Sequence, residues 1–157
     1  MPLAERFAPD KIAGMYEALR RKGRELGISF GDPVHLANSR LAMQASEFAR
    51  DRGKFAAFHE ALFHAYFTEL RDIGDMEVIL YLGRQLGLDR RQLQTALDEN
   101  RYLTRLQAVS EEARQLNITA VPTFLVNGQF KLVGALPLET FRRSLLEIDR
   151  FHAGQGA

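Results

Sequence analysis

The chain has 157 residues, of which 46% are hydrophobic, a size and composition typical of one globular domain or one domain with a sizeable subdomain. Its 21 Lys and Arg against 20 Asp and Glu leave a formal net charge of +1, so overall charge favours neither nucleic acid nor an anionic membrane as a partner. Cysteine is absent, which excludes a disulfide scaffold, a thiolate metal site and any thiol chemistry carried by this polypeptide alone.

The N-terminal segment MPLAERFAPDKIAGMYEALRRKG contains no apolar stretch of the length that a secretory signal needs. No run of about 18 apolar residues, the length that a membrane helix requires, occurs anywhere in the chain. We therefore predict a cytoplasmic protein that does not associate with membranes.

Most of the chain has the apolar spacing of amphipathic helices. Asp10, Asn38, Asp75 and Asp89 precede helical patterns and are predicted N-caps, because their side chains can accept hydrogen bonds from free N–H groups in a first turn. In chain order, the spacing predicts helices over 10–26, 38–52, 54–70, 75–87, 89–99, 102–116 and 137–150, an extended connection at 28–37, and a frayed tail at 151–157.

The stretch ITAVPTFLVNGQFKLVG, residues 118–134, is the part of the chain that reads as β-structure. Asn127 and Gly128 predict a hairpin turn, since a type I′ turn needs positive φ at both positions. Apolar side chains alternate onto both faces of the two strands, and we therefore expect helices on both faces. Pro122 is either a simple strand-start proline or part of a cis Val121–Pro122 bond.

Other candidate sites are weak. His59 and His64 lie five residues apart, which separates them by about 140° around a helix, so they are unsuited to share a metal ion. Asp72 and Asp75, in RDIGD, are better explained as caps than as a catalytic pair. No glycine pattern forms a phosphate-binding loop. We expect neither a metal nor another cofactor.

The run VPTFLVNG, followed by VGA and a helix, resembles the C-terminal half of the thioredoxin fold in the DsbA-like superfamily. The upstream segment SRLAMQASEFARDRGKFAAFHEALFHAYFTELRDIGD resembles the helical insertion of the FrnE type, and the likeness covers roughly residues 10–150. It implies an α/β fold that is mostly helical: an all-helical region over 1–116, then a β-β-α half of a thioredoxin-like fold over 117–150. It also implies that the Val121–Pro122 bond is cis.

The resemblance implies dithiol–disulfide exchange on protein or thiol substrates, with Val121, Pro122 and Thr123 as substrate-binding residues. The family's Cys-x-x-Cys motif and the β-α-β unit that carries it are absent from these residues, so no catalytic residue is assigned. We expect a truncated, redox-inactive form of a longer protein. A hairpin is not expected to be stable alone, and its open edge predicts a possible homodimer.

Two alternatives remain open. One is a relative of kappa-class glutathione transferases or 2-hydroxychromene-2-carboxylate isomerases, which share the helical insertion and use glutathione. The other is a noncatalytic protein-binding module, in which the helical part presents a groove to a partner.

Overall fold

The computed structural model describes residues 2–5, 8–32 and 35–155 and divides the chain into two compact units, Met1–Gln107 and Ala108–Ala157. The architecture is mostly helical with one small sheet, which confirms the predicted fold class. None of the helices in the described part of the chain has the length and hydropathy needed to span a bilayer. The elements are, in order, the short 3-10 helix η1 (Leu3–Glu5), α1 (Pro9–Glu25), α2 (Arg40–Arg50), α3 (Phe55–Phe63), the π-helix η2 (His64–Thr68), α4 (Met76–Gln85), α5 (Arg90–Asp98), α6 (Leu103–Gln115), β1 (Thr123–Val126), β2 (Phe130–Val133) and α7 (Leu138–Gln155).

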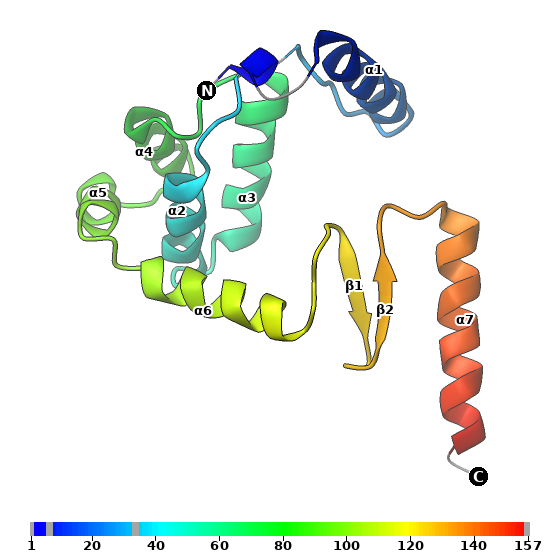
Figure 1. Cartoon of the computed structure of the whole chain (residues 1–157). Helices are drawn as coiled ribbons and strands as arrows, with labels where there is room; N and C mark the ends of the chain where they lie inside the picture. The colour runs from blue at the N-terminus through cyan, green and yellow to red at the C-terminus, as the bar shows by residue number, and fades with distance from the viewer. Residues whose placement is uncertain (1, 6–7, 33–34, 156–157) are drawn as a thin grey trace. The chain divides into compact units, whose positions relative to one another are not determined.

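Helix α2 is the centre of the N-terminal unit and packs against α3, α4 and α5 (Figure 1). Its inward face carries Ala45, Phe48 and Ala49, each with no exposed surface. Phe58 of α3, Ile79 and Leu80 of α4, and Leu93 and Ala96 of α5 complete a fully buried core around it. Gly83 permits the close approach of α4 and α5, because a Cβ added there would lie 2.7 Å from Cδ2 of Leu93.

Two of the four predicted N-caps are confirmed. The Asp75 carboxylate accepts a hydrogen bond from the N–H of Glu77 at 2.8 Å, and that of Asp89 accepts one from the N–H of Gln92 at 2.8 Å. The prediction for Asp10 was wrong: α1 begins earlier, with Ala8 as the N-cap and a proline in its first turn, where no N–H donor is needed.

The predicted cap at Asn38 also moves by one residue. The N-cap of α2 is Ser39, whose side chain makes no capping hydrogen bond. The Asn38 side chain nevertheless stabilises the start of α2, because its Oδ1 accepts a hydrogen bond from the N–H of Arg40 at 3.1 Å.

The segment predicted as one helix over 54–70 is α3 followed by the π-helix η2. A π-helical turn contains more residues than an α-helical turn, so residues beyond it rotate away from the buried stripe that an α-helix would continue. The apolar spacing of a continuous helix over 54–70 would put Phe58, Leu62 and Leu70 on one stripe. Phe58 and Leu62 are buried, whereas Leu70 is 46% exposed with a φ of +59°.

A cluster of polar side chains connects the start of α6 and the residue before it to the end of α2. The Tyr102 hydroxyl donates to Oδ2 of Asp51 at 2.8 Å, and Arg105 donates to Oδ1 of Asp51 at 2.9 Å and to Oε2 of Glu47 at 3.1 Å. Beyond this cluster α6 has no buried residue, and Val109 is 58% exposed. The apolar spacing that predicted a helix over 102–116 therefore marks a helix but no buried face, since α6 crosses the boundary between the two units.

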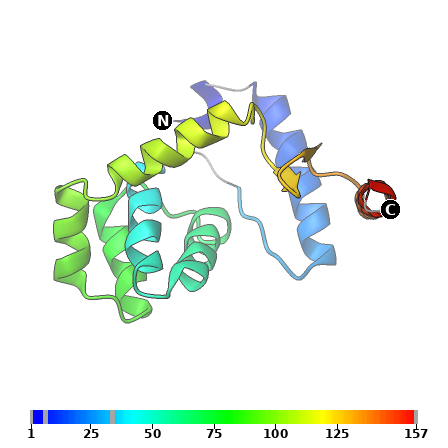
Figure 2. The same ribbon diagram turned by 90° about the horizontal axis from the view of Figure 1, so that it is seen from below.

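The C-terminal unit contains an antiparallel hairpin, in which Thr123 pairs with Val133 and Val126 with Phe130. The φ angles of Asn127 and Gly128 are +52° and +71°, which confirms the predicted turn. Figure 2 shows α7 beside the two strands, nearly end-on.

A helix covers one face of this hairpin. Phe124 contacts Phe141 of α7 with ring centroids 4.8 Å apart, and Phe130 contacts Phe151 at 5.5 Å. On the opposite face Leu125 is 38% and Val133 is 52% exposed. Our expectation of helices on both faces is thus wrong within this unit, because residues 108–157 supply a single helix after the strands.

Helix α7 continues to Gln155, into the segment predicted as a frayed tail over 151–157. Phe151 extends the helix's contact with β2 through its ring pair with Phe130. Within α7, Ile148 is buried, whereas Leu145 is 37% exposed.

The polar cluster predicts a pH dependence of stability. Hydrogen bonds from Arg105, and then from Tyr102, hold the pKa of Asp51 below its ordinary value of 3.8. Because the lowered pKa belongs to the folded state, ionised Asp51 contributes its full stabilisation above the ordinary value, and this is lost as the pH falls through the folded-state pKa. Urea unfolding should therefore give the Asp51→Asn variant a lower midpoint than the wild type at neutral pH.

The difference between the two midpoints should shrink below about pH 4 and vanish in stronger acid. Asp98→Asn is the matched control, since Asp98 makes no ion pair among the described residues, and its curve should follow the wild type. A gap between Asp51→Asn and wild type that persists unchanged into strong acid would contradict the assignment.

Candidate substrate-binding loop

Of the three predicted site residues, Val121 and Pro122 lie in the loop before β1, and Thr123 is the first residue of β1. The Val121–Pro122 peptide bond is cis in the structure. The Val121 side chain is 89% exposed, the highest exposure among the large hydrophobic residues of the described chain. Pro122 is exposed and Thr123 is half-buried as the first residue of β1. The structure thus places the three residues together at the start of β1.

Two hydrogen bonds fix the loop. The carbonyl oxygen of Pro122 accepts from the N–H of Gly134 at 2.8 Å, which extends the ladder between the strands by one pair. The Thr123 hydroxyl donates to the carbonyl oxygen of Ala120 at 2.7 Å, which holds the turn before the proline closed. Gly134 has a φ of +91°, a conformation that a residue with a Cβ rarely adopts.

The main chain of Val121 is left free by these bonds. Among the described residues, none forms a hydrogen bond with its N–H or its C=O. Free backbone groups of this kind are a requirement for pairing with an extended polypeptide.

The free groups of Val121 precede an open sheet edge. β1 pairs with β2 along one edge, and no strand pairs with its other edge within the described residues. Since Pro122 bonds across to Gly134, the alternation of an antiparallel ladder directs the main-chain groups of Thr123 and Leu125 toward the open edge. The loop and the strand edge together offer a row of unpaired donors and acceptors.

The histidines lie in separate environments. The ring of His59 lies between Phe55, with centroids 4.4 Å apart, and Phe63, at 5.5 Å. His64 is exposed, and its Nδ1 is 3.3 Å from a carboxylate oxygen of Glu69. They are half-buried and surface histidines, as their spacing indicated. No group of three or more His, Cys, Asp or Glu side chains suited to a metal ion occurs in the described ranges.

Of the two predicted caps in RDIGD, Asp75 is confirmed, whereas Asp72 bonds a backbone N–H in the loop before α4 and caps no helix. Oδ1 of Asp72 accepts from the N–H of Gly74 at 2.8 Å, and Asp75 caps α4. Both carboxylates are therefore engaged by backbone donors. Ala120 and Gly134, which form the hydrogen bonds that fix the loop, were not predicted as part of the site. The position of Gly134 directly after an apolar strand is the sequence feature that could have identified it.

Replacing Thr123 by Val should loosen the loop. The substitution keeps the shape of the side chain and removes its hydrogen bond to Ala120, so we expect a loss of ~1 kcal/mol in the free energy of unfolding. Amide exchange at Gly134, whose N–H bonds to Pro122, should become faster. Thr95→Val is the control, because the Thr95 hydroxyl makes no hydrogen bond among the described residues, and equal effects of the two variants would contradict the role of Thr123.

Comparisons with known proteins agree with this architecture. The uncharacterized protein YwbO of Bacillus subtilis is 30% identical over 106 residues, which are 67% of this chain and 52% of YwbO. The chain therefore spans about half the length of this curated relative. A probable DsbA oxidoreductase from Streptomyces coelicolor superposes with a TM-score of 0.81 at 23% identity, over 94% of this chain and 67% of that one.

A candidate protein disulfide isomerase from Nitrosomonas europaea superposes with a TM-score of 0.68 at 16% identity, over 93% of this chain and 77% of that one. At such identities both likenesses show the shared fold. The sequence model of the DSBA-like thioredoxin domain matches residues 1–146. With a match over most of its length, this chain belongs to the DSBA-like thioredoxin domain family.

Proposed function

We propose that the chain is a FrnE-type family member that binds extended polypeptides, the protein thiol substrates of its family, through Val121, Pro122 and Thr123. The observation that carries the proposal is the free main chain of Val121. This residue is 89% exposed and lies beside the open edge of β1. In this assignment, residues 1–116 form the helical insertion and flanking helices, residues 117–150 the C-terminal half of the thioredoxin-like fold, and residues 151–157 a terminal extension.

The proposed binding mode is addition of a strand. An extended peptide can pair its N–H and C=O groups with those of Val121 and, further along the edge, with those of Thr123 and Leu125. Each such hydrogen bond contributes roughly 0.5–1.5 kcal/mol. The main chain supplies this part of the affinity, so the peptide's sequence affects it little.

Apolar side chains supply the remaining contacts. Leu125 and Val133 lie on the face of the hairpin away from α7 and are both exposed. Alternate side chains of a strand added beside β1 project onto the same face and would contact Leu125, which lies in β1. We therefore expect a preference for peptides with apolar residues at alternate positions. The homodimer that we expected at this edge stays a prediction, and a second copy would compete with a peptide for the same donors.

The chemistry of thiol–disulfide exchange needs a thiolate nucleophile, and these 157 residues contain no cysteine. We propose that this polypeptide binds substrate and does not by itself oxidise or reduce it. In an insulin-reduction assay the purified chain should show no turnover above buffer. Robust turnover would overturn the redox-inactive assignment.

The binding mode is testable with a matched pair of peptides. One is an unfolded peptide with alternating apolar residues; the other has the same sequence with its backbone N–H groups methylated at alternate positions. In a calorimetric titration the first peptide should bind, and the affinity of the second should be about tenfold lower, since two main-chain hydrogen bonds are removed. Val121→Ala should change the affinity by less than about threefold, because it keeps the main chain.

Equal affinity for the two peptides would contradict strand addition. In NMR titrations, the amide signals of Val121 and Thr123 should shift, whereas that of Gly134, already bonded to Pro122, should move less. Shifts confined to the helical unit would also contradict the proposed site.

A further inference from the structure

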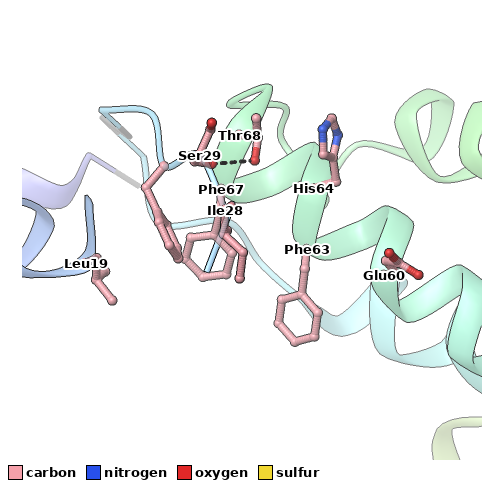
Figure 3. Close-up of a pocket in the computed structure, with 10 residues that line it drawn as sticks. Leu19, Ile28, Ser29, Glu60, Phe63, His64, Phe67 and Thr68 are labelled. Atoms are coloured by element: carbon pink, nitrogen blue, oxygen red, sulfur yellow. Dashed lines mark hydrogen bonds between the residues drawn. The ribbon is translucent and has the colours of Figure 1, made fainter. Parts of the chain in front are cut away.

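The N-terminal unit contains a pocket of about 730 Å³ that the proposed function does not use. It lies between the turn after α1, residues 27–30, and the side of α3 and η2 (Figure 3). Leu19 and Glu60 lie at opposite ends of the view, with the ring of Phe63 between them. Its volume falls within the range of small-molecule sites.

Two hydrogen bonds and a close helix contact build the wall of this pocket. The N–H of Gly31 donates to the carbonyl oxygen of Phe67 at 2.8 Å, and the Thr68 hydroxyl donates to the carbonyl oxygen of Ser29 at 2.7 Å. Gly23 lets the turn fold back on α1, because a Cβ there would lie 2.7 Å from the ring of Phe30. The wall is therefore fixed by specific contacts.

Three phenylalanine rings line the pocket. Phe30 contacts Phe67 edge-on with centroids 5.7 Å apart, and Phe63 stacks on Phe67 at 6.1 Å. Phe63 is 57% exposed, so a ligand can reach it. Phe63 and Phe67 are four residues apart, about one helical turn. The backbone from His64 to Thr68 is a π-helix, a feature that frequently marks functional sites.

The lining of the pocket contains an acidic residue and neither Lys nor Arg. This acidic residue is Glu60. Glu60 forms no ion pair with any described residue. His64 pairs with Glu69, and in Figure 3 its ring points away from that of Phe63. Aromatic faces and an unpaired carboxylate are both attractive to a cation.

We propose that this pocket binds a small organic cation with an apolar body, such as an aromatic quaternary ammonium compound. Its positive group interacts with Glu60 and the ring faces of Phe63 and Phe67, and its apolar body fills the space toward Leu19. The proposal is independent of the peptide site at Val121, since it uses residues of the N-terminal unit only.

Benzyltrimethylammonium and neopentylbenzene, which has the same shape and no charge, form a matched pair of probes. In NMR titrations of the full chain, the cation should cause saturable shifts of the Phe63, Phe67 and Thr68 amide signals and bind more tightly than the neutral compound. Glu60→Gln should weaken binding of the cation roughly fivefold and leave the neutral probe unaffected. Glu17→Gln, an exposed change on α1 outside the pocket lining, should change neither affinity.

Phe63→Leu keeps an apolar side chain and removes a ring face, so it should weaken binding of the cation more than binding of the neutral probe. Thermal melting of each variant shows that it is folded, and the exposure of Glu60 and Phe63 makes both substitutions mild. Tighter binding of the neutral probe, absence of saturable shifts, or an unchanged affinity in Glu60→Gln would each overturn the proposal.

Discussion

The packing of α2 is the constraint on which the N-terminal unit depends. This helix contacts three others, and three of its inward residues, Ala42, Ala45 and Ala49, carry only a methyl group. Small side chains allow helix axes to approach closely, and Phe48 then fills the space between them. A larger residue at Ala45 or Ala49 would separate the helices and expose the core that Phe58, Ile79 and Leu93 share.

The C-terminal unit has no such centre. Its hairpin meets α7 through two aromatic pairs on one face, and the other face and one edge of β1 remain open. A hairpin with one covering helix is a marginal structure, so its local bonds matter more than they would in a full sheet. The bond from Gly134 to Pro122 and that from Thr123 to Ala120 fix the position of the loop from which the Val121 main chain is presented.

Local signals in the sequence were sufficient for much of this fold. Asp75 and Asp89 cap their helices because the capping hydrogen bond spans only two or three residues. The Asn127–Gly128 turn follows from the backbone freedom of these two residues, and the three loop residues lie together because they are consecutive. These local predictions agreed with the structure, whereas the predicted caps at Asp10 and Asn38 miss the observed helix starts by two residues and one residue.

Predictions that depended on what lies beyond the local segment were less accurate. The apolar spacing of α6 indicated a helix correctly, but burial requires a neighbouring element, and Val109 has none in its unit. The same reason applies to Leu125 and Val133, whose spacing indicated a second covered face. The sequence predicted one continuous α-helix and not the π-helix at His64. The π-helix turns Leu70 away from the buried side, and the spacing of the apolar residues before Leu70 does not indicate this change.

The two proposed sites differ in the kind of recognition that they provide. The loop at Val121 offers main-chain groups, which every polypeptide can match, so the sequence preference expected at this site comes from the apolar side chains beside it. The pocket at Phe63 offers side chains alone, an aromatic surface and one carboxylate, and so discriminates by charge and shape. In the loop, the Thr123 hydroxyl is already bonded to Ala120, and in the pocket the Glu60 carboxylate is suited to attract a cation. Thiol–disulfide exchange needs a thiolate, and these 157 residues contain no cysteine.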